Sequence, residues 1–399
     1  MTQSAFVYDA VRTPFGRFGG ALAGVRPDDL AATVVRTIVE RTPAVADDPA
    51  LLDEVIFGNA NGAGEENRNV ARMAALLAGL PTSLPGTTVN RLCGSSLDAA
   101  MIGSRQIETG DADIVLIGGV ESMTRAPWVL PKTEKPYPAG NLQLSSTTLG
   151  WRLVNPEMPS EWTVSLGEAT EQLREKYDIS RERQDEFAAR SHQLAAQAWQ
   201  DGFYDDLIVA VDGIALARDE SIRPDTTSQT LAGLRTSFRK TDGTVTAGNA
   251  SPLNDGASAV LIGSEAAAGR LGRAPVARIA GRGAAANEPQ YFGYAPVEAA
   301  NTALRRAGIG WSDVAAVELN EAFAAQSLAC LDAWDIDPQI VNRHGGAIAI
   351  GHPLGASGGR ILGTLAKELR TSGRRWGVAA ICIGVGQGLA VVLENVEGA

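Results

Sequence analysis

The sequence predicts an α/β protein made of two similar halves, with a long segment inserted between them. Short apolar stretches typical of strands alternate with amphipathic helical stretches toward both ends of the 399-residue chain. A Val-Asn-Arg triplet at 89–91 recurs at 341–343, and each copy precedes a special loop, a helix and an apolar strand ending in Gly. We therefore expect two α/β halves related by a pseudo-twofold axis, with matching loops meeting at one place.

The first half is expected to comprise residues 1–122 together with 247–272. Strands are predicted at 5–10, 54–58, 113–118 and at the end of 246–263, and helices at 28–40, 69–78 and from Ser96 to a stop at Gly110. In the helix at 28–40, apolar residues recur at helical spacing and acidic residues occupy the first turn. This alternation predicts a mainly parallel sheet covered on both faces.

Residues 123–246 are predicted to form an inserted loop domain. Positions 124–165 are rich in Pro, Ser, Thr and Trp and lack periodicity, and such long irregular segments are usually functional. Two helices are expected next, at 167–177 and 180–200. His192 lies in the second of these helices among polar residues, so we expect it to be solvated.

The second half is expected to span residues 273–399 and to repeat the first plan. Strands are predicted at 277–283, 313–319 and 380–384, and helices at 296–308 and 322–334. Cys330 lies in the last of these helices, and we assign it to packing alone.

Composition excludes several classes of function. The formal net charge of −11 argues against binding to nucleic acid or to an anionic membrane. No apolar run is long enough to span a bilayer, and the N-terminus lacks the features of a signal peptide. The three cysteines are too scattered for a disulfide framework or a zinc site. A cytoplasmic location, reduced thiols and no bound metal are therefore expected.

Four residues in the matching loops carry candidate chemistry. Cys93 directly precedes a helix, whose N-terminus favours a thiolate, although a small buried cysteine is the common alternative. His352 lies in the Gly-rich stretch 344–359, where a buried histidine satisfied by a carbonyl is the alternative. Cys382 ends a strand and is followed by Gly384, whose N–H could hold an anion. Asn320 follows another strand, as a turn residue or helix cap would.

Together these motifs resemble the thiolase family of acyl-CoA C-acyltransferases. The matching stretches, in chain order, are Asn90-Arg-Leu-Cys-Gly-Ser, Gly119-Val-Glu-Ser-Met, Gly248-Asn-Ala-Ser, Asn320-Glu-Ala-Phe-Ala, Gly346-Ala-Ile-Ala-Ile-Gly-His-Pro-Leu-Gly-Ala-Ser-Gly and Cys382-Ile-Gly-Val-Gly. The resemblance implies a five-layered α/β/α/β/α duplication with a loop domain. It also implies a homo-oligomer, either a dimer or a dimer of dimers, with residues 124–145 as contacts.

The resemblance assigns catalytic roles. Cys93 would be the nucleophile that becomes acylated, and His352 would take its proton and then help to stabilise an oxyanion. Cys382 would be the second acid/base, acting on the α-carbon. Asn320 would orient a water in one oxyanion hole, and the N–H groups of Cys93 and Gly384 would form the other. A thiolate suits this carbon–carbon cleavage because it leaves as readily as it attacks.

The resemblance also implies that CoA thioesters bind as substrates, with no further cofactor. The residues expected to line the nucleotide and pantetheine tract are Arg223, Phe238, Ala247, Ser251 and Leu253. Leu166 stands where the family usually has a pocket methionine, and Phe323 would wall the acyl site. The chain departs from the family pattern at Ser165, Pro252, Phe292, Tyr294 and Val385.

Within the family, the sequence is most similar to the subgroup that cleaves 3-oxoadipyl-CoA in aromatic-acid catabolism. The segment 64–73 and the stretch after Cys382 carry this similarity. A substrate with a terminal carboxylate calls for a nearby cation, and the candidates are Arg68, Arg72 and Arg125. The alternatives are an acetoacetyl-CoA thiolase, a general 3-ketoacyl-CoA thiolase of β-oxidation, a ketoacyl synthase, and a non-catalytic acyl-CoA-binding protein.

Overall fold

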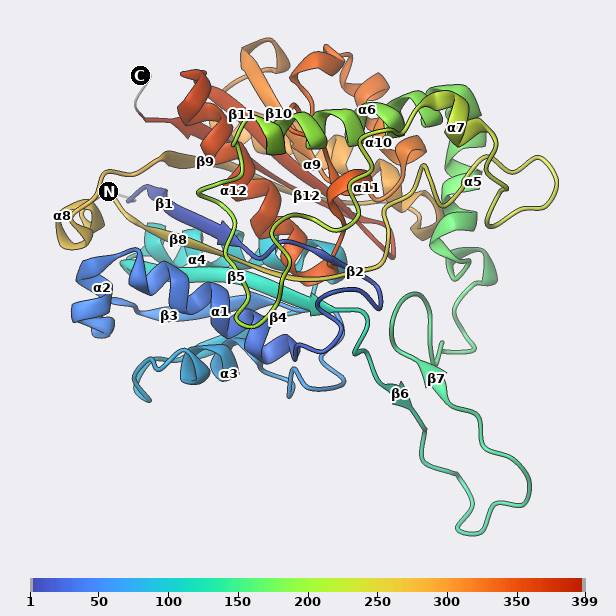
Figure 1. The fold of residues 1–399 in the computed structure, drawn as a ribbon, viewed down its shortest axis with the longest axis horizontal. Helices are drawn as coiled ribbons and strands as arrows, with labels where there is room; N and C mark the ends of the chain where they lie inside the picture. The colour runs from blue at the N-terminus through green and yellow to red at the C-terminus, as the bar shows by residue number, and fades with distance from the viewer. Residues whose placement is uncertain (1–2, 397–399) are drawn as a thin grey trace.

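The computed structural model describes residues 3–396 (Figure 1). The expected domain limits at 1–2 and 397–399 lie outside this range. The long strands of the first half are β1 (Ala5–Arg12), β3 (Glu54–Gly58), β4 (Gly86–Val89), β5 (Ile114–Ser122) and β8 (Asn254–Ser264). Those of the second half are β9 (Ala277–Ala286), β10 (Val314–Leu319), β11 (Trp376–Ile383) and β12 (Gln387–Asn395).

The helices fall in the intervals between these strands. In the first half they are α1 (Pro27–Glu40), α2 (Pro43–Asp47), α3 (Val70–Leu77), α4 (Ser95–Thr109) and α8 (Ala267–Leu271). In the second half they are α9 (Pro296–Ala307), α10 (Ala324–Trp334), α11 (Ala347–Ile350) and α12 (Leu354–Ser372). The inserted segment contributes α5 (Leu166–Lys176), α6 (Arg181–Gln200) and α7 (Ser228–Ala232).

The two halves follow the same path through the sheet. The strand order is β10-β11-β12-β9-β1-β8-β5-β3-β4. In the first half, β3 is parallel to β5, β5 is antiparallel to β8, and β8 is antiparallel to β1. In the second half, β10 is parallel to β11, β11 is antiparallel to β12, and β12 is antiparallel to β9. This equivalence confirms the predicted duplication, and β1 and β9 join the halves.

The prediction of a mainly parallel sheet is wrong, because the sheet is mixed. Only the pairings β3 with β4, β3 with β5 and β10 with β11 are parallel among the described strands. A parallel pair needs a crossover connection of a dozen or more residues. Residues 384–386 alone link β11 to β12, so these strands form an antiparallel hairpin.

The helices complete five layers. Helices α1 and α3 cover the outer face of the first-half strands, and α9 covers the outer face of the second-half strands (Figure 1). Helices α4 and α12 lie between the halves and pack against each other. At their crossing, a Cβ on Gly358 would lie 2.1 Å from the backbone nitrogen of Leu97, so only glycine permits this approach. The helices that follow Cys93 and His352 are thereby held together.

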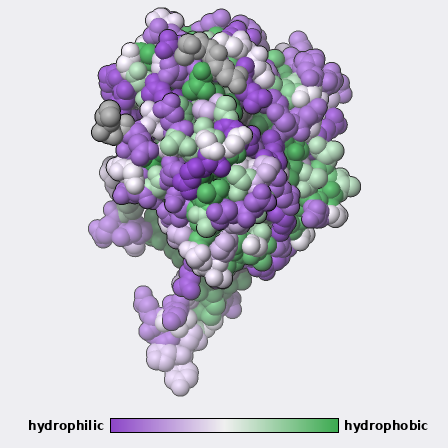
Figure 2. Space-filling model, turned by 90° about the vertical axis from the view of Figure 1, so that its left-hand side faces the viewer, coloured by the Kyte–Doolittle hydropathy of each residue, from purple (hydrophilic) through white to green (hydrophobic). Residues whose placement is uncertain are grey.

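The inserted segment has two parts. Helices α5, α6 and α7 pack beside the second half, whereas β6 (Trp128–Val129) and β7 (Ser145–Ser146) form the base of a long arm. Figures 1 and 2 show this arm, residues 128–146, projecting from the body of the protein. Large apolar side chains on it are exposed, including Trp128 at 70% and Tyr137 at 94%. No helix within residues 3–396 has both the length and the hydropathy needed to cross a membrane.

Candidate active site

Cys93 lies at the start of the central helix pair, in a 3-10 turn (Leu92–Gly94) that leads into α4. Its side chain is 7% exposed. Burial raises the pKa of the Cys93 thiol to about 11, and the N–H groups of Gly384 and Cys93, which point at Sγ, offset only part of this rise. The helix N-terminus favours the thiolate, but desolvation outweighs this effect. The resting group is a neutral thiol that needs a base.

His352 has the properties of such a base. Burial, together with the positive charge of Arg360, lowers the pKa of His352 to about 3, so the ring is neutral at physiological pH. Its Nδ1 lies 2.6 Å from Ser357 Oγ, and that hydroxyl donates its one proton to the Pro353 carbonyl at 3.0 Å. Both hydrogen bonds form together when Ser357 Oγ accepts from Nδ1–H. This tautomer leaves the lone pair on Nε2, where it can take a proton.

Asn320 lies beside this ring and is itself held from behind. Its Nδ2 is 3.3 Å from His352 Nε2 and 3.4 Å from Nδ1. Its Oδ1 accepts a hydrogen bond of 3.1 Å from Arg360, which pairs with Glu318 at 3.3 Å. The Arg360 and Glu318 side chains are almost completely buried. Because the guanidinium occupies Oδ1, the amide nitrogen of Asn320 must face the site, where it can donate to an oxyanion or a water.

Cys382 is the penultimate residue of β11 and is completely buried. It packs in an apolar cluster with Phe292 and Phe323. Burial, and then the neighbouring Cys93, raises the pKa of the Cys382 thiol well above its ordinary value. Cys382 is thus a neutral thiol in the resting site and can give a proton.

Glu121 binds the Gly-rich stretch to the first half. This carboxylate, on β5, accepts hydrogen bonds from the backbone N–H groups of Ala60, Asn61 and Gly355. A Cβ at Gly119 would lie 1.9 Å from the Gly355 carbonyl oxygen. Glycines of the stretch thus allow protein segments to approach one another.

Two cavities meet at Cys93. One has a volume of about 430 Å³ and is also lined by Met123, Ser165, His352 and Pro252. The other has a volume of about 310 Å³ and is also lined by Asn61, Glu121, Thr148, Arg152 and Gly384. They share Cys93, Leu149, Gly150, Trp151, Leu166 and Leu354. Cys93 therefore stands where two arms of one ligand could join.

Most residues expected at the CoA tract line the larger cavity. These are Leu166, Phe238, Ser251, Leu253 and Phe323. Arg223 and Ala247 line neither cavity and are exposed. Of the departures from the family pattern, Ser165, Pro252 and Phe292 line the larger cavity and Val385 lines the smaller one. Tyr294 lines neither and stacks on Tyr177 with ring centroids 4.3 Å apart.

The expectation that His192 is solvated is wrong. Its side chain is 5% exposed, and its Nδ1 accepts a hydrogen bond of 3.2 Å from the backbone N–H of Arg223. Burial, with a smaller contribution from the charge of Arg223, lowers the pKa of His192 to about 4. Cys330, assigned to packing, is completely buried and its thiol contacts the Gly293 carbonyl oxygen at 3.3 Å.

None of the three arginines suggested as carboxylate partners lines either cavity. Arg125 is bound by Glu65, Arg72 donates to the carbonyls of Leu84 and Thr82, and Arg68 is exposed. Sequence reasoning missed Arg152, Ser357, Arg360 and Glu318. Ser357 and Arg360 lie three residues apart on α12, the helix that begins directly after His352 and Pro353, and this spacing is a signal that could have identified them.

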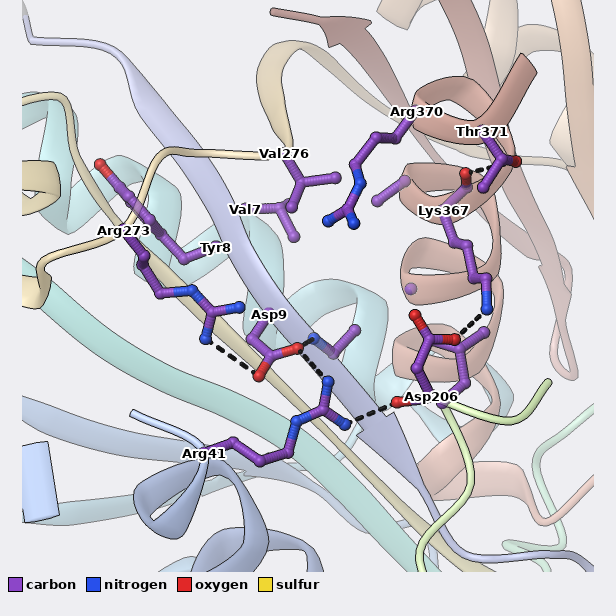
Figure 3. A pocket seen from close by; sticks show the side chains of 14 residues that line it. Val7, Tyr8, Asp9, Arg41, Asp206, Arg273, Val276, Lys367, Arg370 and Thr371 are labelled. Atoms are coloured by element: carbon purple, nitrogen blue, oxygen red, sulfur yellow. Dashed lines mark hydrogen bonds and ion pairs between the residues drawn. The ribbon is translucent and has the colours of Figure 1, made fainter. Parts of the chain in front are cut away.

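A further cavity, of about 170 Å³, lies away from these residues (Figure 3). Asp9 there pairs with Arg41 and with Arg273, each at 3.1 Å, and Lys367 pairs with Asp206. No cysteine or histidine lines it. Its charges serve mainly to tie β1, α12 and the inserted segment together. No cluster of metal-binding residues occurs within residues 3–396.

Cys93, a neutral histidine and the Gly384 N–H donor line a two-armed cavity, and the buried Cys382 thiol interacts electrostatically with Cys93. These groups define an acyl-transfer enzyme that works through a cysteine. The chain belongs to the thiolase family: residues 5–266 match the thiolase N-terminal domain and residues 273–395 match the thiolase C-terminal domain.

Two named relatives and one solved structure are similar to this chain over nearly its full length. The chain is 48% identical over 403 residues to the beta-ketoadipyl-CoA thiolase of Pseudomonas putida, covering 99% of this chain and 100% of that protein. It is 48% identical over 404 residues to the 3-oxoadipyl-CoA/3-oxo-5,6-dehydrosuberyl-CoA thiolase of Escherichia coli K12, with the same coverage. Human mitochondrial 3-ketoacyl-CoA thiolase in complex with CoA superimposes with a TM-score of 0.91 at 37% identity, covering 99% of this chain and 98% of that chain.

Proposed function

We propose that this protein is a degradative thiolase that cleaves 3-oxoadipyl-CoA with free CoA, giving succinyl-CoA and acetyl-CoA. The observation that carries the proposal is the position of Cys93 at the junction of two cavities, beside the N–H of Gly384 and a neutral His352. The near-full-length identity to relatives named as beta-ketoadipyl-CoA thiolases supports this choice of substrate.

In the first half-reaction, His352 Nε2 takes the proton of the Cys93 thiol and the thiolate attacks the C3 carbonyl carbon. The carbonyl electron pair moves to oxygen, and nearby N–H donors stabilise the oxyanion. The oxyanion then collapses and the C2–C3 bond breaks, leaving the electron pair on C2. The Cys382 thiol protonates C2, so acetyl-CoA departs and a succinyl thioester remains on Cys93.

In the second half-reaction, the Cys382 thiolate takes the proton of the CoA thiol. The CoA thiolate attacks the acyl carbon and Cys93 leaves as a thiolate, which recovers its proton from His352. Each group ends in its starting state. The raised pKa values of both cysteines suit this exchange, since neither thiol ionises until its partner is in place. CoA and its thioesters are the only small molecules that the scheme requires.

We assign the larger cavity to the pantetheine arm of CoA and the smaller one to the acyl arm. The support is the lining of the larger cavity by Phe238, Ser251 and Leu253, which fit a narrow chain. The exposed positions of Arg223 and Ala247 limit them to contacts with the outer nucleotide end of CoA. The expected limits of the loop domain, 123–246, remain part of this proposal.

A homo-oligomer formed through the arm is also proposed. Its exposed apolar side chains, such as Trp128, Leu142 and Leu144, are the kind that a second copy would cover. A cytoplasmic location is proposed because the mechanism requires Cys93 and Cys382 as free thiols, and the reducing cytosol maintains them.

Steady-state cleavage of 3-oxoadipyl-CoA, acetoacetyl-CoA and a longer 3-oxoacyl-CoA would test the proposal. We expect the highest kcat/KM for 3-oxoadipyl-CoA and ping-pong kinetics. A preference for acetoacetyl-CoA would replace the proposal with a short-chain thiolase. Mass spectrometry after mixing with acetyl-CoA should show an acetyl group on Cys93. Its absence would point to a non-catalytic acyl-CoA-binding protein.

A further inference from the structure

The smaller cavity contains one cation, and this cation has no acidic partner. Of the residues that line it, Arg152 alone carries a positive charge. Its one hydrogen bond is from Nη2 to Asn61 Oδ1 at 3.3 Å, and no ion pair to Arg152 forms within the described part of the chain. By contrast, Arg125 and Arg239, also on the inserted segment, are bound by Glu65 and Glu168. Arg152 therefore keeps most of its five N–H donors available.

We propose that Arg152 binds the terminal carboxylate of a dicarboxylic acyl chain whose other end is attached to Cys93. The inference rests on the proposed function and adds the residue that selects a carboxylate-ended substrate over an alkyl one. A planar guanidinium can hold a carboxylate by two parallel N–H···O bonds, a geometry that no neutral chain end can replace.

The local backbone fixes the side of the loop on which Arg152 lies. Gly150 and Leu153, which flank the pair Trp151–Arg152, have φ angles of +79° and +50°. A left-handed conformation is uncommon for leucine, and it marks a sharp turn directly after Arg152. The indole of Trp151 donates to the Val164 carbonyl at 3.2 Å. The Trp151 side chain thus anchors this turn, and Arg152 is partly buried at the cavity wall.

The volume and lining of the cavity accommodate a succinyl group. A succinyl chain extends roughly 5–6 Å from Sγ to its carboxylate, as four successive bonds allow. The cavity volume of about 310 Å³ exceeds what such a chain needs. Leu92, Leu149 and Leu354 provide apolar wall for the two methylene groups. Asn61 and Thr148 accompany Arg152 as polar lining residues.

Glu121 lines the same cavity and sets the direction of the chain. Its oxygens face the N–H groups of Ala60, Asn61 and Gly355, so this carboxylate is held by protein donors. Burial raises the pKa of Glu121 to about 7, so Glu121 offers a substrate carboxylate no cation and repels it when ionised, whereas Arg152 attracts it. Asn61 lies between the two, with its backbone N–H bound to Glu121 and its side-chain oxygen to Arg152.

The test compares two substrates of equal chain length in two enzymes. 3-Oxohexanoyl-CoA has a methyl group where 3-oxoadipyl-CoA has its carboxylate. We expect Arg152→Met to lower kcat/KM for 3-oxoadipyl-CoA by about 10- to 100-fold, as loss of a partner in a partly buried charge pair does. The same variant should change kcat/KM for 3-oxohexanoyl-CoA by less than about threefold, since no charge is recognised there.

The matched control is Arg68→Met, which removes an exposed arginine outside both cavities and should leave both substrates unaffected. Turnover of 3-oxohexanoyl-CoA shows that a variant is folded. If Arg152→Met gives no turnover of either substrate, Arg152→Gln repeats the comparison. An equal loss for both substrates, or no loss for 3-oxoadipyl-CoA, overturns the inference.

Failure of the proposed function gives a different result. If the wild-type enzyme cleaves 3-oxohexanoyl-CoA but leaves 3-oxoadipyl-CoA intact, the proposed substrate is wrong and the role of Arg152 falls with it. If the wild type cleaves 3-oxoadipyl-CoA and Arg152→Met cleaves it equally well, only the role of Arg152 is wrong.

Discussion

His352 Nδ1 lies 2.6 Å from Ser357 Oγ, five residues further along the chain, and the hydroxyl of Ser357 donates to the Pro353 carbonyl at 3.0 Å. This pair fixes the imidazole tautomer before any substrate arrives. Removing the hydroxyl leaves the ring in place but allows the tautomer with its proton on Nε2, which cannot accept a proton from Cys93.

We therefore expect Ser357→Ala to slow acylation of Cys93 about 10-fold, with little change in KM. His352→Ala removes the base itself and should slow acylation by about 10²- to 10⁴-fold. Rapid-mixing mass spectrometry of the acetyl-enzyme measures both rates. Normal acylation in His352→Ala would show that another group activates the thiol.

The lowered pKa of His352 also predicts a pH dependence of stability. Its folded pKa of about 3 lies below the ordinary value of 6.5, so the unfolded chain binds a proton first as pH falls. The contribution of His352 to the free energy of unfolding is present above pH 6.5 and is lost as pH falls toward 3. Between pH 6.5 and 5 this loss is about 2 kcal/mol.

Urea unfolding of wild type and His352→Ala at pH 7 and pH 5 checks this expectation. The wild type should lose more stability than the variant over this interval. A parallel decline in both proteins would mean that His352 titrates alike in the folded and unfolded states. The wild type must be compared with the variant because Glu121 also titrates in this range. Burial raises the pKa of Glu121 to about 7, so its contribution to the free energy of unfolding grows as pH falls, opposite to that of His352.

The crossing of α4 and α12 predicts the effect of a single methyl group. Gly358→Ala places a Cβ 2.1 Å from the backbone nitrogen of Leu97, where nothing flexible can move aside. We expect a loss of about 1–3 kcal/mol in the free energy of unfolding. Activity should fall as well, because the two helices that follow Cys93 and His352 would separate.

Gly269→Ala is the matched control. Gly269 lies in α8, and a Cβ there meets no atom within 4 Å. This change should stabilise the protein by about 0.5–1 kcal/mol, as alanine does at an exposed helical position. Equal effects of the two substitutions in thermal unfolding would contradict the close packing at Gly358.

Val385 predicts a substitution that relieves strain. It lies in the turn between β11 and β12 with φ +68°, a conformation that costs a β-branched residue roughly 1–2 kcal/mol. Replacing the valine with glycine removes this strain, but glycine also gains conformational entropy in the unfolded chain, which offsets part of the stabilisation. Val385→Gly should therefore raise the free energy of unfolding by about 0.5–1 kcal/mol. Denaturant unfolding measures the change.

The reverse change nearby provides the control. Gly386 also has a positive φ, +76°, and a Cβ there would lie 2.3 Å from the Asn287 carbonyl oxygen. Gly386→Val should destabilise the protein, by more than the Val385 change stabilises it. If Val385→Gly lowers stability, the contacts of the valine side chain outweigh its backbone strain.

Much of the local structure followed from residue patterns. The helix predicted at 180–200 forms as α6, with Ser180 as its N-cap, and the predicted stop at Gly110 is a left-handed C-cap with φ +81°. These features are local, because a cap or a stop depends on a few neighbouring residues. The prediction of a mainly parallel sheet was wrong because strand direction depends on connections that residue alternation does not specify.

The sequence by itself determined the family, the duplication and the residues that carry the chemistry, since ordered motifs around Cys93, Asn320, His352 and Cys382 are read along the chain. Only the tertiary structure decided their protonation. Burial makes Cys93 a neutral thiol and His352 a neutral base, and desolvation depends on segments distant in the chain. The same reason applies to Arg152, since a cavity wall is assembled from many segments and no local pattern marks its members.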